Sequence, residues 1–268
     1  MTEKTPSSSG PVDPLVLRDK GAVADRRRRA PMVALNDGSL ASLRSGTEIH
    51  ETLREVDVCF VFDTTGSMSD KIDGLKTCIT EFVAEMARLA LSWRTTCVPF
   101  GDLTVHGDRV DGQLPFVDDV TSAQEQIRGL PRFSGGANLG ESSIEAMHAG
   151  TTKGWRSNAV RVIILLTDEP ALDAQRASEI DGQLSQQEII CFVCSVPEQY
   201  FQHWASAHGG RWTAISSHMD TGSLLKLLKS LVRDVAAVAS EIHAIAGGSV
   251  SRYLAMPADK RTALGRGE

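Results

Sequence analysis

Long apolar runs, aromatic side chains and an excess of positive charge are all scarce in this chain of 268 residues. Its longest apolar runs, such as residues 162–166, are strand-sized and far short of the ~20 residues that a membrane-spanning helix needs. Aromatic residues make up 5%, and the four tryptophans are dispersed, so no stacking platform for nucleic acid is evident. The formal net charge is -6. We therefore expect neither a membrane partner nor a nucleic-acid partner.

The N-terminal segment lacks the apolar core of a secretory signal, because residues 2–10 are polar. The five cysteines are odd in number, and four of them lie in apolar stretches, as is typical of reduced, buried thiols. Cys191 and Cys194 have C-x-x-C spacing, but within a strand their side chains point to opposite faces. No second ligand pair accompanies them, so we exclude a zinc or redox motif. These features predict a cytoplasmic protein.

The chain divides into three parts. Residues 1–54 include a linker-like Ser-Gly-Pro stretch and a run of four arginines, which favours an exposed, partly disordered N-terminal extension. In residues 55–245, apolar runs of strand length alternate with helical patterns. Residues 246–268 form a polar C-terminal tail after Gly247 and Gly248.

The alternation of strands and helices predicts the architecture of the middle part. Strand runs expected at 56–62, 95–100, 160–166, 188–195 and 211–215 are separated by amphipathic helices. Crossover connections of this kind give a mostly parallel sheet flanked by helices, an α/β doubly wound, Rossmann-like fold. Near-continuous apolar strands indicate burial on both faces. Ligand sites in such folds lie at the carboxyl ends of the strands.

Two acidic residues fall at such strand ends. Asp63 directly follows the run 56–62, and Asp168 follows 160–166. The hydroxyl groups of Thr65 and Ser67 come at alternate positions after Asp63, on a turn where Gly66 lets the backbone fold closely around a ligand. Hard divalent cations prefer such oxygen ligands. If the two strands are neighbours, both carboxylates face one site.

Three segments of the chain together resemble a known family. Asp63-Thr64-Thr65-Gly66-Ser67, called the 63–67 loop below, is similar to the D-x-S-x-S or D-x-T-x-S segment of the metal-ion-dependent adhesion site (MIDAS) of von Willebrand factor A domains. Residues 134–141, with their Gly-Gly pair, resemble the middle loop of that site, and Thr167-Asp168 resembles its last segment. The resemblance covers residues 55–240. It implies a bound Mg²⁺, with Mn²⁺ or Ca²⁺ as alternatives, and Asp63, Thr65, Ser67 and Asp168 as ligands.

The middle loop departs from the family pattern. A threonine normally supplied there as a metal ligand is replaced by Leu139, which cannot ligate. The adjacent Asn138 can offer an amide oxygen, directly or through water, and is the fifth candidate ligand. Leu139 also leaves open a metal-free scaffold that keeps only the fold.

The function implied by the resemblance is recognition of another protein. In the family, the metal keeps an open coordination position that an acidic side chain of the partner completes. We therefore expect a non-enzymatic interaction module, an adaptor in a larger complex, whose partner presents Asp or Glu. A Mg²⁺-dependent phosphohydrolase with Asp63 as nucleophile is the alternative, since D-x-T-G also occurs in phosphotransfer enzymes. Two features count against the phosphohydrolase: no lysine stands in a clear motif after a strand between the two segments, and Glu169 is followed by Pro170 instead of completing an acidic pair. The absence of a P-loop disfavours an NTPase.

Acidic residues also occur in a long loop and within the first strand. Residues 102–119 contain five aspartates, for which a second cation site is one interpretation. Their spacing does not match an EF-hand, so we favour a solvated loop. Asp57 is a polar residue within an otherwise apolar strand run. We expect it to lie at the start of the strand, where its carboxylate can contact water.

Overall fold

The structure is a computed structural model that describes residues 32–34, 40–42, 55–68, 92–136, 140–216 and 219–264, with single helical positions between 71 and 86. The chain forms two compact units, Met1–Arg44 and Ser45–Glu268. In the first, β1 (Met32–Ala34) pairs antiparallel with β2 (Leu40–Ser42). The rest of the predicted N-terminal extension lies outside the described residues.

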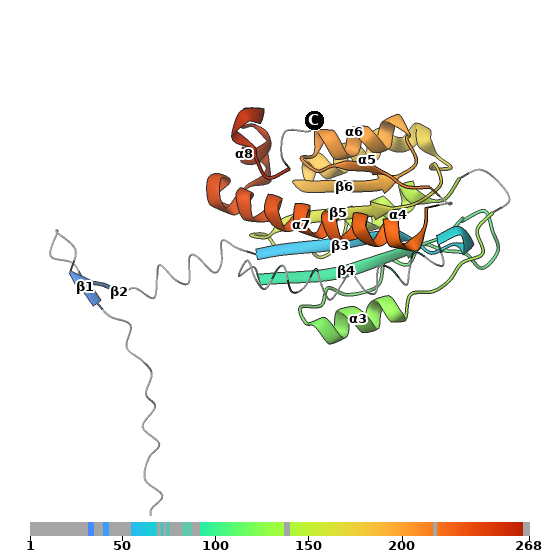
Figure 1. Cartoon of the computed structure of the whole chain (residues 1–268), viewed down its shortest axis with the longest axis horizontal. Helices are drawn as coiled ribbons and strands as arrows, with labels where there is room; N and C mark the ends of the chain where they lie inside the picture. Colours follow the sequence, from blue (N-terminus) through green and yellow to red (C-terminus); the bar gives the residue numbers. More distant parts are fainter. Residues whose placement is uncertain are drawn as a thin grey trace, which may run out of the picture. The chain divides into compact units, whose positions relative to one another are not determined.

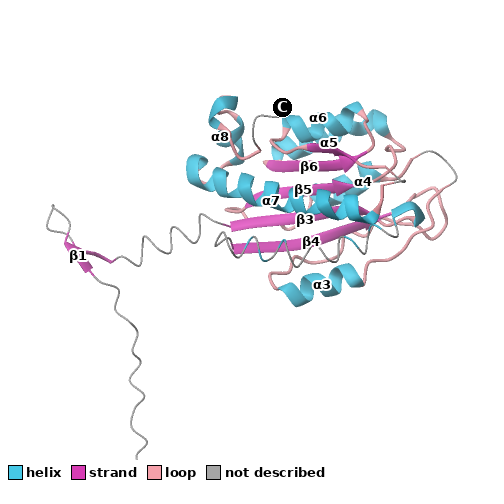
Figure 2. Cartoon of the chain, viewed as in Figure 1, coloured by secondary structure: helices cyan, strands magenta, loops and turns pink. Residues whose placement is uncertain are grey.

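The second unit is built on a five-stranded parallel sheet in the order β4-β3-β5-β6-β7 (Figures 1 and 2). The strands are β3 (Glu55–Asp63), β4 (Ser92–Phe100), β5 (Val160–Leu166), β6 (Ile189–Ser195) and β7 (Trp212–Ala214). The helices whose bounds are described are α3 (Val120–Arg128), α4 (Ser143–Thr151), α5 (Ala177–Gln186), α6 (Gln199–Ala207), α7 (Thr221–Ala246) and α8 (Val250–Leu254), with short 3-10 turns η1 (Gly66–Met68), η2 (Ala174–Arg176) and η3 (Ala258–Lys260). The predicted doubly wound α/β fold is confirmed.

Helices cover both faces of this sheet because the strand side chains alternate. Val58 and Phe60 of β3 join a core cluster with α3, α7 and α8 on one face. Cys59 and Val61 join a second cluster with α4, α5 and α6 on the other. Cys191 and Cys194 separate in the same way and are free, buried thiols, as predicted. Within the described residues, no helix is both long enough and apolar enough to span a membrane.

The strand order reverses at β3. The chain leaves β3 for β4 on one side of it and later returns as β5 on its other side, with Phe62 opposite Leu166 and Asp63 opposite Phe100. Such a reversal opens a crevice at the carboxyl ends of the strands, where doubly wound proteins bind ligands. Asp63 and Asp168 therefore follow two strands that are direct neighbours.

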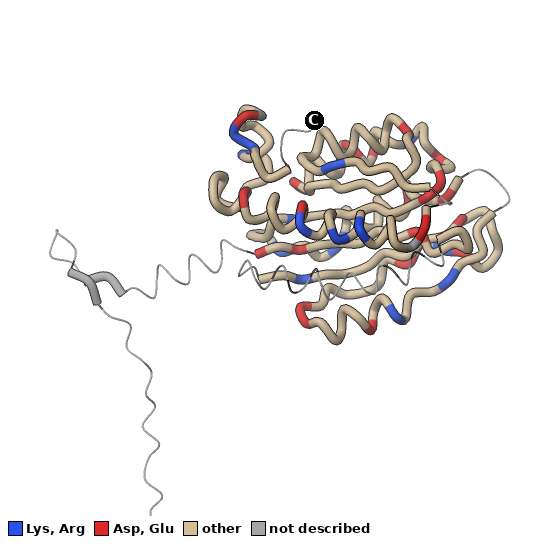
Figure 3. Tube along the Cα trace, in the orientation of Figure 1, with Lys and Arg blue, Asp and Glu red and all other residues tan. Residues whose placement is uncertain are grey.

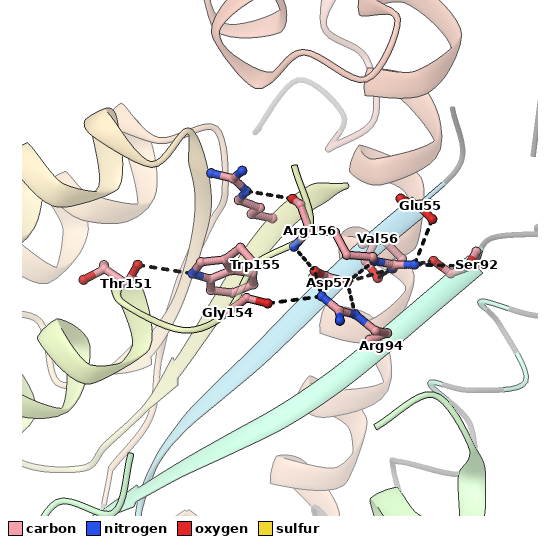
Figure 4. A network of polar contacts seen from close by, with 10 residues as sticks. Glu55, Val56, Asp57, Ser92, Arg94, Thr151, Gly154, Trp155 and Arg156 are labelled. Atoms are coloured by element: carbon pink, nitrogen blue, oxygen red, sulfur yellow. Dashed lines mark hydrogen bonds and ion pairs between the residues drawn. The ribbon is translucent and has the colours of Figure 1, made fainter. Parts of the chain in front are cut away.

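At the amino ends of the strands, an ion-pair network around one buried carboxylate joins three segments (Figure 4). Asp57 is 0% exposed and accepts hydrogen bonds from Arg94 Nε and Nη2 at 3.0 and 2.6 Å. It also accepts from the backbone N and the Nε of Arg156, both at 2.8 Å. Arg156 further donates to the carbonyl oxygens of Val56 and Ser92. The predicted solvated position of Asp57 is wrong, because its carboxylate is buried and two partly exposed guanidinium groups compensate its charge.

Ordered packing continues past the end of α7. Val250 and Tyr253 of α8, in the region expected to be a polar tail, are buried in the same cluster as α7. Glu241 of α7 accepts hydrogen bonds from Tyr253 Oη at 2.7 Å, Thr262 N at 2.7 Å and Ala263 N at 2.9 Å. This one carboxylate therefore holds the segment 253–263 against α7.

Replacement of Asp57 tests the ion-pair network. Asp57→Ala leaves two guanidinium groups without their carboxylate, and we expect the free energy of unfolding in urea to fall by about 3–5 kcal/mol. Burial alone raises the pKa of Asp57, but hydrogen bonds from Arg94 and Arg156 outweigh it and lower the pKa. The stabilisation is therefore present above about pH 4 and is lost as the pH falls further.

The matched control is Asp173→Ala. Asp173 is 48% exposed and lies 3.9 Å from Arg176, so its loss should change stability by less than about 1 kcal/mol. Equal effects of the two substitutions would contradict a structural role of the Asp57 network.

Candidate metal site

The 63–67 loop is held in shape by its first carboxylate. Asp63 ends β3 and is 0% exposed. Its Oδ1 accepts hydrogen bonds from Thr65 N at 3.0 Å and from Thr65 Oγ1 at 2.6 Å. Met68 N donates to the carbonyl oxygen of Thr65, and the Met68 side chain is fully buried, which fixes the turn of η1 on the core. The Thr65 and Ser67 hydroxyl oxygens lie 3.4 Å apart.

The second carboxylate of the site belongs to Asp168, which follows β5. Ser67 Oγ donates to Asp168 Oδ1 at 2.9 Å, and Thr167 Oγ1 donates to Asp63 Oδ2 at 3.0 Å. Two segments about a hundred positions apart in the chain are thus joined by direct side-chain hydrogen bonds. The structure brings together four of the five predicted ligands, Asp63, Thr65, Ser67 and Asp168. The fifth, Asn138, lies outside the described residues, as does Leu139.

The Gly-Gly segment packs directly against the loop. Phe133 N donates to the carbonyl oxygen of Thr64 at 3.0 Å. Gly135 has φ +71°, and a Cβ there would lie 3.2 Å from the Cβ of Thr65 and 3.1 Å from Glu141 Oε1. Asp108 accepts from the backbone N of Gly135 at 2.9 Å and holds the segment in place. A glycine is required at this position both for the backbone conformation and for the close approach.

Two further acidic residues lie near the site, although neither is among the predicted ligands. Glu141 is 4% exposed, and its Oε2 has no hydrogen-bond partner in the part of the chain that the structure describes. Burial, followed by the charges of Asp63 and Asp102, raises the pKa of Glu141 to about 8. Asp102 is 0% exposed; its Oδ1 accepts from Thr104, and its Oδ2 likewise lacks a described partner. The prediction of a solvated loop is therefore wrong at Asp102.

Both residues carried a usable sequence signal. Asp102 follows β4 closely, much as Asp63 ends β3, so it belongs to the same edge of the sheet. Glu141 closes the Gly-rich segment that resembles the family's middle loop. Figure 3 shows several acidic positions at the end of the sheet toward which the strand arrows of Figure 1 point.

A lysine, also missed, supplies positive charge at the site. Lys71 Nζ lies 2.6 Å from Asp168 Oδ2 and donates to the carbonyl oxygen of Ser67 at 3.2 Å. Its side chain is 3% exposed, and that of Asp168 is 0% exposed. The sequence signal is its spacing, because Lys71 follows Ser67 by four residues, which is one helical turn.

These groups fit a hard divalent cation. The candidate donors are carboxylate and hydroxyl oxygens, the ligands that Mg²⁺, Mn²⁺ and Ca²⁺ prefer. Burial raises the pKa of Asp63 to about 6, although the hydrogen bonds from Thr65 act to lower it. The negative charge of this carboxylate is therefore not fully compensated by its surroundings. Among the described residues, no three His, Cys, Asp or Glu side chains are grouped to hold a metal. A cation here would thus depend on the Thr65 and Ser67 hydroxyls as well as on two carboxylates.

Comparison with known proteins identifies the family. The model of the von Willebrand factor type A domain matches residues 57–221, more than half of the chain, and the chain belongs to that family. The fold and the sequence resemblance agree with this assignment. No curated protein matches the chain.

Solved structures of one protein of the mussel byssus are similar in fold. Proximal thread matrix protein 1 (PTMP1), in its crystal form 2, aligns with a TM-score of 0.50 at 16% identity, over 68% of this chain and 46% of that one. The same protein with a zinc-occupied MIDAS motif aligns with a TM-score of 0.49 at 15% identity, over 68% of this chain and 47% of that one. The matched region thus spans less than half of those chains.

The raised pKa values of Asp63 and Glu141 predict how the metal-free protein responds to pH. Their folded-state pKa values, about 6 and about 8, exceed the ordinary values of 3.8 and 4.5. The folded protein therefore keeps protons that the unfolded chain has released, and stability is lost as the pH rises through this range. With a chelator present, we expect the free energy of unfolding to fall by about 5 kcal/mol between about pH 5 and 8, most of it from Glu141.

Glu141→Gln should flatten the upper part of this pH profile, and saturating Mg²⁺ should reduce the slope in the unaltered protein. Glu179→Gln is the control, since Glu179 is 52% exposed and pairs with Arg176 on the surface. A metal-free profile that is flat over the same range would show that these two carboxyl groups are not perturbed.

Proposed function

We propose that this domain binds another protein through a divalent cation held by Asp63, Thr65, Ser67 and Asp168. Von Willebrand factor type A domains are in general interaction modules, and this chain belongs to that family. The observation that carries the metal-dependent version is the 2.9 Å hydrogen bond between Ser67 Oγ and Asp168 Oδ1. It brings the hydroxyls of the 63–67 loop within reach of a carboxylate from the neighbouring strand.

Magnesium is the proposed ion, with Mn²⁺ and Ca²⁺ as alternatives. Two carboxylates and two hydroxyls fill only part of an octahedral shell, so water or an outside ligand completes it. The bound ion would supply an open coordination position for a carboxylate. Asp63, Thr65, Ser67 and Asp168 would hold and orient it, and the partner would present an Asp or Glu side chain.

The site is proposed to recognise rather than to catalyse. Asp63, the nucleophile of the alternative phosphohydrolase, is 0% exposed. A substrate phosphoryl group would have to reach this buried carboxylate for Asp63 to attack it. The four described cysteines are buried free thiols, which supports a place in the reducing cytoplasm. The proposed role there, as an adaptor in a larger complex, rests on the family alone.

Asp63→Asn tests the proposed metal site. The amide keeps the size of the side chain but loses its charge, so we expect affinity for Mg²⁺ and Mn²⁺ to fall by about tenfold or more in calorimetric titration. Asp173→Asn, which changes an exposed carboxylate outside the site, should leave the affinity unchanged. No heat of binding with the unaltered protein would favour the metal-free scaffold.

Two companion assays distinguish partner binding from catalysis. Affinity capture of partners should succeed with Mg²⁺ and fail with a chelator, and Asp63→Asn should behave like the chelator. Turnover of a generic phosphomonoester that Asp63→Asn abolishes would instead establish the phosphohydrolase.

A further inference from the structure

One carboxylate of the proposed metal site is already paired with a positive charge of the protein itself. Lys71 Nζ lies 2.6 Å from Asp168 Oδ2, while Asp168 Oδ1 accepts the hydroxyl of Ser67. Both oxygens of Asp168 are therefore engaged without an ion. A divalent cation that binds Asp168 must share it with the ammonium group.

The Lys71–Asp168 ion pair is buried, which strengthens the electrostatic interaction between its two charges. Lys71 is 3% exposed, and the side chain of Asp168 is 0% exposed, so water screens neither charge well. The second contact of Lys71, at 3.2 Å to the carbonyl oxygen of Ser67, lies within the 63–67 loop itself. The ammonium is thus fixed beside the place where the ion would bind.

We propose that Lys71 is an internal counter-ion that competes with the divalent cation for Asp168 and sets how tightly the site binds it. This inference rests on the proposed metal-dependent function. The Lys71 ammonium and the cation repel each other across a few ångströms of buried protein, which weakens cation binding. Without the cation, the same ammonium compensates Asp168 and stabilises the loop.

Lys71 has a second conceivable role that predicts the opposite sign. If its hydrogen bonds only positioned Asp168 for the ion, removal of the side chain would loosen a ligand and weaken binding. If Lys71 competes, removal strengthens binding. Affinity and metal-free stability then change in opposite directions, which a purely structural residue would not produce.

The test compares Lys71→Met with the unaltered protein by calorimetric titration with Mg²⁺ and Mn²⁺ and by thermal unfolding. We expect about tenfold or more tighter binding. We also expect a lower Tm with chelator, and a larger rise of Tm on addition of the ion. Lys71→Gln, which keeps a hydrogen-bond donor without the charge, provides a second variant if Lys71→Met does not fold.

Lys153→Met is the matched control. Lys153 is a partly buried lysine that donates to the carbonyl oxygens of Gly112 and Leu114 at 2.9 and 2.8 Å, outside the site. Its loss should lower the Tm and leave the affinity for the ion unchanged.

The outcomes separate this inference from the function on which it rests. Binding by the unaltered protein that is unchanged or weaker in both Lys71 variants overturns the competition and leaves the metal site standing. No binding by any of these proteins overturns both. Binding that appears only when Lys71 is replaced, and disappears again with Asp63→Asn, supports the competition in its strongest form.

Discussion

The pairing of β3 with a parallel neighbour on each side is the constraint on which the site depends. It sets Asp63 beside Phe100 and places the end of β5 one strand away. The backbone of Thr64 then completes the arrangement, because its N donates to Phe100 and its carbonyl oxygen accepts from Phe133. The 63–67 loop is thereby fixed to β4 and to the Gly-Gly segment before its side chains engage any ligand. The hydrogen bonds to Asp168 and from Thr167 are consequences of this strand order.

The two ends of the sheet differ in how far the charges of their buried carboxylates are compensated. At the amino ends, Asp57 has two arginines whose hydrogen bonds outweigh the effect of burial on its pKa. At the carboxyl ends, the carboxyl groups of Asp63 and Glu141 have raised pKa values, and an oxygen of Glu141 has no described hydrogen-bond partner. A compensated network of the first kind maintains the fold. An under-compensated group of the second kind is what a cation-binding site requires before the cation arrives.

The fold and the core of the site are predictable from the sequence because both depend on local pattern. Asp63 and Asp168 could be found from the apolar runs that precede them, and Gly66 from the turn between strand and helix. The spacing of Lys71 and the place of Glu141 in the Gly-rich segment are visible in the sequence. Their roles are not, because these arise from the contact with Asp168 and from proximity to Asp63. The burial of Asp57 was not predicted for a similar reason, because its partners Arg94 and Arg156 are 37 and 99 residues away in the chain. The roles of Asn138 and Leu139 stay predictions.

The Asp57 network has a mechanical consequence. A pull on the chain ahead of β3 reaches the sheet at Glu55, whose carboxylate lies 3.1 Å from Arg156. The same guanidinium donates a hydrogen bond to the carbonyl oxygen of Val56. The next residue, Asp57, accepts hydrogen bonds from both Arg94 and Arg156. Since β3 has a neighbour on either side, the load is shared by two strand pairs and cannot peel one strand from an open edge. Tension from that direction is therefore resisted at the first three residues of the strand, at the opposite end of β3 from the 63–67 loop.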